Sequence, residues 1–276
     1  MNTSNFALIT GGSSGIGLAL GKTLARQGTD ICLLARDQSK LQAALNEVSR
    51  NKIRQTQRIM TLSCDLRDFP ALSQELKKLT EGFGLPDLVV NSAGLTYPGI
   101  FEDLDVETFH WLMEINYFGT VHVLKCLIPD MINRGSGKIV NISSQAGFIG
   151  VFGYSAYGAS KYAVLGLSDV LRAEMKPRGI QVSIAFPPDT QTPQLAFEEP
   201  LKPFVTKEIA SSAKVLSAEE VAEAILKGVE KGKYVIIPGL EGKVFFCLTQ
   251  LLGNLTYPVM DWMVARAQKK KNKEKH

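Results

Sequence analysis

The stretch "FALITGGSSGIG", from Phe6 to Gly17, places an apolar, strand-forming run directly before a glycine-rich turn. An amphipathic segment of helical length follows it. Glycine lets the backbone approach a pyrophosphate closely, and the helix N-terminus offers free N–H groups and the positive end of its dipole. The glycine pattern alone would also fit an ordinary tight turn. The strand before it and the helix after it favour a dinucleotide-binding turn.

Similar apolar runs recur along the chain and alternate with segments of helical length. Most runs are almost continuously apolar, which is typical of strands buried on both faces of a parallel sheet. The predicted strands are 6–10, 30–35, 58–63, 87–91, 138–143, 180–186 and 234–238, and the predicted helices are 15–27, 38–50, 71–83, 106–133, 155–176 and 218–231. The sequence therefore predicts an α/β fold with a single doubly wound (Rossmann) parallel sheet of about seven strands and helices on both faces.

Two regions break this alternation. Residues 189–216 form a long connection rich in proline, threonine and glutamate, and connections of this length are usually lids or binding loops. Residues 240–276 begin with an apolar segment, uncharged from Val244 to Met260, and end with the basic run "KKKNKEK" at 269–275. We therefore expect a domain over 1–239 that includes the lid, followed by a separate C-terminal segment.

The composition excludes several classes of protein. Hydrophobic residues make up 45% of 276 residues, which is ample for a globular core, and the net charge of +4 does not indicate a nucleic-acid partner. The four cysteines lie far apart without a CxxC pair, which predicts neither a metal site nor a disulfide framework. The N-terminus lacks the pattern of a secretion signal, so we expect a protein that faces the cytosol.

The end of the second predicted strand bears on the choice of dinucleotide. A carboxylate there binds a ribose 2′-hydroxyl, whereas an arginine accommodates a 2′-phosphate. Ala35 stands at the expected position of the acid, and Arg36 follows it. Asp37 could compete for the ribose, but an aspartate before "QSKLQAAL" is a natural helix N-cap. The sequence therefore favours NADPH.

Two further strand ends could contact the nucleotide. Asp65 and Leu66 follow the third strand, where they could hold the adenine edge, although Asp65 could equally be a loop or cap residue. The segment "NSAG" (91–94) follows the fourth strand, and its small residues would allow close backbone approach. By itself this segment could be only a tight turn.

Tyr157 and Lys161 are spaced i, i+4 and so share one face of a predicted helix. A free tyrosine has a pKa near 10, and a neighbouring ammonium favours the phenolate and lowers that pKa. A serine from an adjacent strand end could then hold a carbonyl oxygen while Tyr157 supplies its proton. Taken alone, the pair could instead be a half-buried tyrosine and a solvated lysine.

The combination of TGxxxGxG, NSAG, and a serine thirteen residues before YxxxK resembles the short-chain dehydrogenase/reductase family, from about Ala7 to Pro238. The resemblance implies hydride transfer between a nicotinamide and a carbonyl or alcohol. It implies Ser144, rather than Ser143, as the catalytic serine and Tyr157 as the acid/base. Lys161 would tune Tyr157 and bind the nicotinamide ribose, and Asn116 would help to hold a proton-relay water. The family resemblance leaves Tyr154 without an assigned role.

The resemblance also implies which residues bind the NADPH. They are Gly11, Ser13, Ser14, Gly15, Ile16, Gly17, Arg36, Asp65, Leu66, Asn91, Ala93, Gly94, Tyr157, Lys161, Pro187, Thr190 and Thr192.

The segment "FPPDTQTP" (186–193) departs from the family's usual Pro-Gly because Pro188 replaces the glycine. This departure resembles the 3-ketodihydrosphingosine reductase branch, which implies a long-chain sphingoid ketone as substrate. Independently, Phe148, Ile149, Val151 and Phe152 would border the substrate cleft, and an apolar wall suits a long acyl chain. The alternative is that these four residues pack beneath the lid.

The C-terminal segment fits a membrane-surface role. Its uncharged run of seventeen residues is at the short limit for a membrane span, so we interpret it as interfacial or re-entrant. Trp262 would lie at headgroup level, and the lysines would face anionic lipid. The expected location is the cytosolic face of a membrane, the endoplasmic reticulum in a eukaryote or the inner membrane in a bacterium. An oligomer interface with a solubilising tail is the alternative.

Other functions remain compatible with the sequence. The substrate could be another lipophilic ketone, such as a steroid, a retinoid or a 3-oxoacyl thioester, or the chain could be a non-catalytic NADPH-binding scaffold. The family resemblance also implies a homodimer or homotetramer paired through the helices at 106–133 and 155–176.

Overall fold

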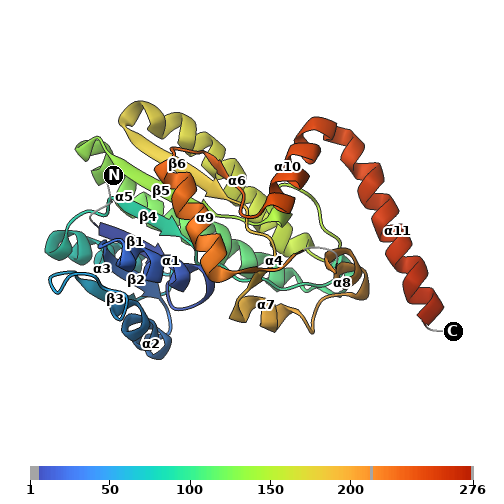
Figure 1. The fold of residues 1–276 in the computed structure, drawn as a ribbon, viewed down its shortest axis with the longest axis horizontal. Helices are drawn as coiled ribbons and strands as arrows, with labels where there is room; N and C mark the ends of the chain where they lie inside the picture. Colours follow the sequence, from blue (N-terminus) through green and yellow to red (C-terminus); the bar gives the residue numbers. More distant parts are fainter. Residues whose placement is uncertain (1–5, 212–213, 275–276) are drawn as a thin grey trace.

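The computed structural model describes residues 6–211 and 214–274. One parallel sheet of seven strands, in the order β3-β2-β1-β4-β5-β6-β9, runs through the molecule (Figure 1). Its strands are β1 (Phe6–Thr10), β2 (Asp30–Ala35), β3 (Ile59–Ser63), β4 (Leu88–Asn91), β5 (Gly137–Ile142), β6 (Ile180–Ala185) and β9 (Val235–Ile236). The predicted α/β class, parallel sheet and strand number are confirmed, although the last strand is shorter than the expected 234–238.

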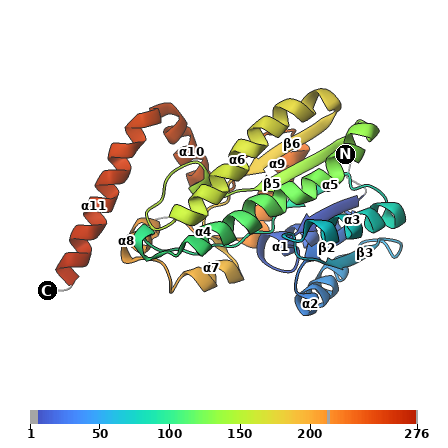
Figure 2. The ribbon, with the colours of Figure 1, turned by 180° about the vertical axis from the view of Figure 1, so that it is seen from behind.

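Helices cover both faces of the sheet because successive side chains of each strand point to opposite sides. In β1, Ala7 and Ile9 belong to one hydrophobic core, whereas Phe6 and Leu8 belong to the other. The first core is closed by α1 (Gly15–Arg26), α2 (Gln38–Ser49) and α9 (Ala218–Glu230), and the second by α3 (Phe69–Phe83), α5 (Gly119–Arg134) and α6 (Ser155–Met175). Figures 1 and 2 show these two helix layers from opposite sides.

The strand order reverses between β1 and β4, which pair in register from Ala7–Leu88 to Thr10–Asn91. In doubly wound sheets, ligands bind at the carboxyl ends of the strands beside such a switch point. The predicted glycine turn follows β1 and the NSAG segment follows β4, so both lie at this edge.

Two helix N-termini have side-chain caps, and the one at Asp37 is the cap expected from the sequence. The Asp37 carboxylate accepts hydrogen bonds from the backbone N–H groups of Ser39 and Lys40, both at 3.0 Å. Ser217 and Glu220 form a capping box at the start of α9. The predicted long helix at 106–133 is instead divided into α4 (Val106–Met113), one π-helical stretch (Glu114–Phe118) and α5.

The predicted lid is largely ordered secondary structure rather than an irregular loop. It contains β7 (Thr190–Gln191), α7 (Pro193–Glu198) and α8 (Phe204–Ala210), and it leads into β8 (Leu216–Ser217); residues 212–213 lie outside the described part. The C-terminal segment forms α10 (Leu240–Leu252) and α11 (Thr256–Glu274), and α11 packs against α8, where Lys270 forms an ion pair of 2.8 Å with Glu208. Among the described residues, no helix is both long enough and apolar enough to cross a membrane.

Candidate active site

A cavity of about 970 Å³ lies at the carboxyl edge of the sheet, beside the switch point. Most of the predicted site residues line it, although they come from elements far apart in the sequence. They are Gly11, Ser13, Ser14, Gly15, Ile16, Arg36, Asp65, Leu66, Ala93, Gly94, Ser144, Tyr157, Lys161, Pro187, Thr190 and Thr192. Gly17, Asn91 and Asn116 are the predicted site residues that do not line the cavity.

The glycine turn is held in a conformation that side chains would disturb. Gly11 and Gly15 have φ of 65° and 52°, in the left-handed region that favours glycine. A Cβ at Gly11 would lie 2.8 Å from the Ala93 backbone nitrogen, so the turn packs directly against the NSAG segment. A Cβ at Gly17 would overlap the Gly11 carbonyl oxygen and lie 2.8 Å from its carbon. Gly17 therefore supports the turn without facing the cavity.

The NSAG segment is held by residues that the sequence analysis did not single out. The Thr10 hydroxyl accepts hydrogen bonds from the backbone N–H groups of Ser92 and Ala93, both at 3.1 Å. Asn91 donates to Asn141 at 2.9 Å inside the sheet, so its side chain cross-links β4 to β5 rather than facing the predicted nucleotide site. The sequence offered one signal for Thr10, because it is the polar residue at the end of the first predicted strand.

Cationic side chains surround the end of β2. Arg36, which is half exposed, lies 4.0 Å from Asp65, and Asp65 forms a closer ion pair of 2.7 Å with Arg67. The hydrogen bond from Arg67 is the largest influence on the Asp65 carboxyl and holds its pKa below the usual value. Lys40 and Arg67 line the cavity with Arg36, and sequence reasoning missed both of them.

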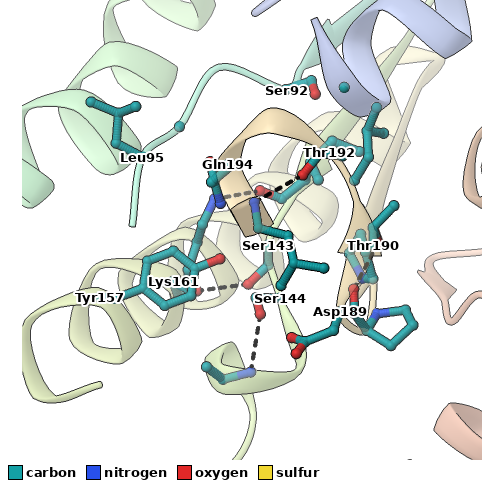
Figure 3. A pocket seen from close by; sticks show the side chains of 18 of the residues that line it. Ser92, Leu95, Ser143, Ser144, Tyr157, Lys161, Asp189, Thr190, Thr192 and Gln194 are labelled. Carbon is teal, nitrogen blue, oxygen red and sulfur yellow. Dashed lines mark hydrogen bonds between the residues drawn. The ribbon is translucent and has the colours of Figure 1, made fainter. Parts of the chain in front are cut away.

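Ser144, Tyr157 and Lys161 meet at the centre of the cavity (Figure 3). Ser144 follows β5, and its hydroxyl accepts a hydrogen bond from Ala146 N–H at 3.3 Å. Tyr157 and Lys161 both come from α6, where one helical turn separates them, and both are at least nine-tenths buried. The neighbouring Ser143 donates instead to the Lys161 carbonyl at 3.0 Å, which gives this serine a structural role.

The expected effect of Lys161 on Tyr157 is wrong for this structure. Burial is the largest influence on Tyr157 and raises its pKa, whereas a hydrogen bond from Ser144 lowers it. The Lys161 ammonium lies 5.8 Å from the centre of the Tyr157 ring and donates to the Ile142 carbonyl at 3.0 Å. The lysine is itself desolvated, which lowers its own pKa to about 8. The sequence gives the spacing of the pair but not the depth of its burial.

The buried lysine predicts a measurable dependence of stability on pH. The unfolded chain holds the Lys161 proton up to its ordinary pKa of 10.5, whereas the folded protein releases it near pH 8. Between these values the unfolded state binds more protons, so the contribution of this residue to stability increases with pH. Below pH 8 that contribution is constant.

We therefore expect the free energy of unfolding of the wild type, minus that of Lys161→Met, to rise by up to about 1.4 kcal/mol per pH unit above pH 8. Urea denaturation between pH 7 and pH 10 measures this difference. Lys176→Met removes an exposed lysine next to the end of the same helix and is the matched control. A wild-type curve parallel to that of Lys161→Met across this range would contradict the prediction.

Asn116 lies in the π-helical stretch between α4 and α5, a feature that often occurs at functional sites. Its side chain accepts from Leu95 N–H at 2.7 Å and donates to the Leu95 carbonyl and the Ser160 hydroxyl, each at 2.9 Å. A Cβ at Gly94 would lie 3.1 Å from both the Asn116 Oδ1 and the Lys161 Nζ. Asn116 thus connects the chain after β4 to α6 at Ser160, the residue that precedes Lys161.

The apolar walls differ in part from the sequence prediction. Ile149 and Val151 line the cavity, but Phe148 and Phe152 do not. The prediction for Phe148 is wrong because its ring packs against Phe186 and against Phe246 of α10, with ring centres 5.2 and 5.0 Å apart. Sequence reasoning missed the apolar wall contributed by the C-terminal helices: Phe245, Met260 and Met263.

The remaining predicted residues lie on the segment that faces α6. The Thr190 hydroxyl donates to the Pro188 carbonyl at 2.7 Å. Thr192 caps α7 by accepting from Leu195 N–H at 3.3 Å, and its methyl carbon lies 3.1 Å from the Cβ that Gly15 would carry. Thr192 therefore touches the glycine turn and joins the two halves of the cavity.

Comparisons with known proteins agree with this geometry. The model of the family described as short chain dehydrogenase matches residues 5–200. A 3-ketodihydrosphingosine reductase of Bos taurus is 40% identical over 243 residues, which are 88% of this chain and 73% of the relative. A Dehydrogenase/reductase SDR family member 7B of Xenopus laevis is 32% identical over 95% of this chain and 82% of its own length. A short-chain dehydrogenase from Sphingobium yanoikuyae, solved in complex with NADPH, is 29% identical and superimposes with a TM-score of 0.76 over 93% of this chain and 95% of that one.

Proposed function

Because this chain belongs to the short-chain dehydrogenase/reductase family, we propose that it uses NADPH to reduce the 3-ketone of 3-ketodihydrosphingosine to dihydrosphingosine, a step in sphingolipid synthesis. One observation carries the proposal. A single cavity joins the glycine turn and Arg36 to the group of Ser144, Tyr157 and Lys161, and it continues between apolar walls. The identity with curated 3-ketodihydrosphingosine reductases supports the choice of substrate.

The residues present fit a phosphorylated dinucleotide. The turn from Gly11 to Gly15 leaves no room for side chains and lies at the N-terminus of α1, where free N–H groups favour a pyrophosphate. Arg36 and Lys40 at the end of β2 supply charge for a 2′-phosphate, and Asp37 is occupied in capping α2. The glycine turn that would hold the pyrophosphate and the cations that would favour a 2′-phosphate thus line the same cavity.

When bound, NADPH supplies the hydride that reduces the ketone carbon. The Tyr157 hydroxyl donates a proton to the ketone oxygen, and its raised pKa keeps the phenol protonated at neutral pH. The Ser144 hydroxyl donates its single hydrogen bond to the ketone oxygen before proton transfer and to the phenolate that remains afterwards. Lys161, with its pKa lowered to about 8, can return a proton to Tyr157. Asn116 holds α6 in position against the chain after β4 through its hydrogen bonds to Leu95 and Ser160.

The apolar part of the cavity suits the alkyl chain of the substrate. Ile149 and Val151 form one wall, whereas Phe245, Met260 and Met263 from the C-terminal helices form another. Burying methylene groups against such side chains contributes about 0.8 kcal/mol each. A steroid or a retinoid would use the same walls, so a panel of ketones decides between these substrates.

Arg36 provides the first test of the cofactor and the substrate together. We expect rapid oxidation of NADPH with 3-ketodihydrosphingosine in mixed micelles and much slower oxidation of NADH. Because hydrogen bonds to a charged group contribute about 1.5–3 kcal/mol and Arg36 is half exposed, Arg36→Ala should raise the KM for NADPH about tenfold. Its kinetics with NADH should not change.

Arg50→Ala removes an exposed arginine at the C-terminal end of α2, outside the cavity, and serves as the control. Equal turnover with the two cofactors would overturn the NADPH assignment. Turnover of steroid, retinoid or 3-oxoacyl substrates without turnover of 3-ketodihydrosphingosine would overturn the substrate assignment.

We also propose that the C-terminal helices contact a membrane surface, which places the enzyme at the cytosolic face of a membrane. Exposed apolar side chains are spread over α10, α11 and the turn between them: Leu240, Val244, Leu248, Leu251, Leu252, Leu255, Tyr257, Val259 and Trp262. Exposed lysines follow on α11, which lies at the edge of the molecule (Figure 2). An apolar surface beside a basic one is typical of helices that bind anionic bilayers. Residues 275–276 of the predicted basic tail lie outside the described part.

The lysines provide the test of this location. A basic residue near an anionic membrane contributes about 1 kcal/mol, so the double variant Lys269→Gln and Lys273→Gln should bind phosphatidylserine vesicles about 30-fold more weakly. Co-sedimentation with vesicles measures the binding. The control is Lys77→Gln and Lys78→Gln on α3, which should bind as the wild type does. Equal binding of all three proteins would contradict membrane contact through α11.

Finally, we propose a homo-oligomer that pairs through α5 and α6. Tyr162 and Val170, which lie on one face of α6, are 43% and 56% exposed, as expected for an apolar face that a second copy covers. Light scattering of the purified protein decides between monomer, dimer and tetramer.

A further inference from the structure

Beside the proposed catalytic group, one buried cation is shared by three carboxylates. The Lys202 ammonium lies 3.1 Å from Asp189, 3.4 Å from Glu198 and 3.0 Å from Glu199, and the Lys202 side chain is only 2% exposed. Asp189 and Glu198 both line the cavity, whereas Glu199 is largely exposed to solvent. The two carboxylates that face the cavity therefore share a cation that is already partly neutralised by a third.

Glu198 is the more buried of these two cavity residues. Its side chain is 8% exposed, and burial raises the pKa of its carboxyl even though Lys202 acts in the opposite direction. A buried carboxylate is costly unless enough positive charge or enough hydrogen-bond donors face it. One more cation in the cavity would accordingly stabilise the charged form of Glu198.

A second buried polar side chain lies beside Glu198. Thr96 is 1% exposed, and the interaction of its hydroxyl with the Glu198 carboxyl lowers the pKa of that carboxyl. On the other side, the Tyr154 hydroxyl is hydrogen-bonded to Glu198, so polar groups converge there inside an otherwise apolar wall.

This polar spot is close to the reacting centre. The charges of Glu198 and Asp189 both raise the pKa of Tyr157, so their field reaches its hydroxyl. The rings of Tyr154 and Tyr157 are 5.5 Å apart between centres. Figure 3 shows Asp189 on the segment that faces Ser144 and Tyr157 across the cavity. A ligand whose carbonyl is held by Tyr157 would place its neighbouring atoms near these carboxylates.

We propose that Glu198, assisted by Asp189, binds the ammonium group of an α-amino ketone and thereby selects the substrate. The inference rests on the proposed function, because 3-ketodihydrosphingosine carries a free amine on the carbon next to its ketone. Steroids, retinoids and 3-oxoacyl thioesters carry no such amine. The bound ammonium would also offset the carboxylate field at Tyr157 and make its phenol a stronger acid at the moment of proton transfer.

The test compares two ketones with and without the amine. The substrates are 3-ketodihydrosphingosine and the same long-chain hydroxyketone lacking its amine, each assayed with NADPH. We expect the wild type to prefer the amino ketone in kcat/KM by about 10- to 100-fold, the range of a hydrogen bond between charged groups. Glu198→Gln should abolish this preference, so that the ratio of kcat/KM for the amino ketone to that for the amine-free ketone falls to about 1. Glu199→Gln, which alters the exposed neighbour on Lys202, should keep it.

The outcomes separate this inference from the proposed function. A wild type that reduces both ketones equally well, or a Glu198→Gln variant that keeps the preference, would overturn the role of Glu198 while leaving the reductase assignment intact. A wild type that reduces neither ketone would overturn the proposed function itself.

A measurement on the wild type alone covers the case in which Glu198→Gln does not fold. The KM for the amino ketone should rise as pH rises and the substrate amine loses its proton, relative to the KM for the amine-free ketone. The other charged and titratable groups around Glu198, namely Asp189, Glu199, Lys202, Tyr154, Tyr157 and Lys161, face both substrates, so the amine is the one group by which the two measurements differ. A ratio that does not change with pH would overturn the proposal.

Discussion

Replacing Tyr157 by phenylalanine is expected to lower kcat about a thousandfold, within the range of a lost general acid, and to leave the affinity for NADPH unchanged. The substitution removes only the hydroxyl, which is hydrogen-bonded to Ser144 in the wild type, and it keeps the ring that packs against Tyr154. The loss of the phenol should therefore affect proton transfer far more than folding. Steady-state kinetics with 3-ketodihydrosphingosine and fluorescence titration with NADPH measure the two quantities.

Tyr162→Phe is the matched control for this variant. Tyr162 lies on the same helix but is 43% exposed, so the loss of its hydroxyl should change neither kcat nor cofactor binding. If Tyr157→Phe retained full turnover, the proposed acid/base role would be wrong. If the wild type bound NADPH and reduced no ketone at all, the scaffold alternative would replace the reductase.

Gly17→Ala is expected to weaken NADPH binding about 100-fold and to lower the free energy of unfolding by about 2–3 kcal/mol, because overpacking at a fixed backbone costs about 1–3 kcal/mol and 1.4 kcal/mol is tenfold in affinity. The new Cβ would overlap the Gly11 carbonyl oxygen, and backbone cannot move aside as a flexible side chain can. The turn that cradles the pyrophosphate must therefore shift. Isothermal titration with NADPH and urea denaturation measure the two effects.

Gly82→Ala is the control because it makes the same chemical change where there is space. Gly82 lies on α3, and a Cβ there would meet nothing within 4 Å. Alanine favours a helix over glycine, so this variant should keep full affinity and gain up to about 1 kcal/mol of stability. Wild-type affinity in Gly17→Ala would show that the turn tolerates the side chain.

Local sequence patterns were sufficient for the arrangement of strands and helices. Apolar runs separated by helical periodicity gave the parallel sheet, and the cap at Asp37 formed where its residue type predicted it. These features depend on neighbours within a few positions of each other, so the chain encodes them locally. The break of the predicted helix at 106–133 into a π-helical stretch at Asn116 has no comparable local signal.

The site was predicted unevenly for a related reason. Tyr157 and Lys161 were found because one helical turn separates them both along the chain and in space, whereas Ser144 was assigned through the family resemblance. Glu198 and Met260 were missed, since only the folding of the lid and the C-terminal helices brings them to the same cavity. Phe148 was wrongly assigned to the cavity wall because the sequence does not show whether its ring faces the cavity or packs against other side chains, as it does against Phe246.

The amino-acid sequence by itself determined the parallel α/β architecture, the glycine turn for a dinucleotide and the pairing of Tyr157 with Lys161. Each of these is set by short-range geometry: strand alternation, helix periodicity and the conformational freedom of glycine. Only the tertiary structure decided the electrostatics. Burial raises the pKa of Tyr157 and lowers that of Lys161 to about 8, and one buried Lys202 is shared by three carboxylates. Desolvation and charge interactions depend on which distant segments surround a group, and that information appears only when the chain has folded.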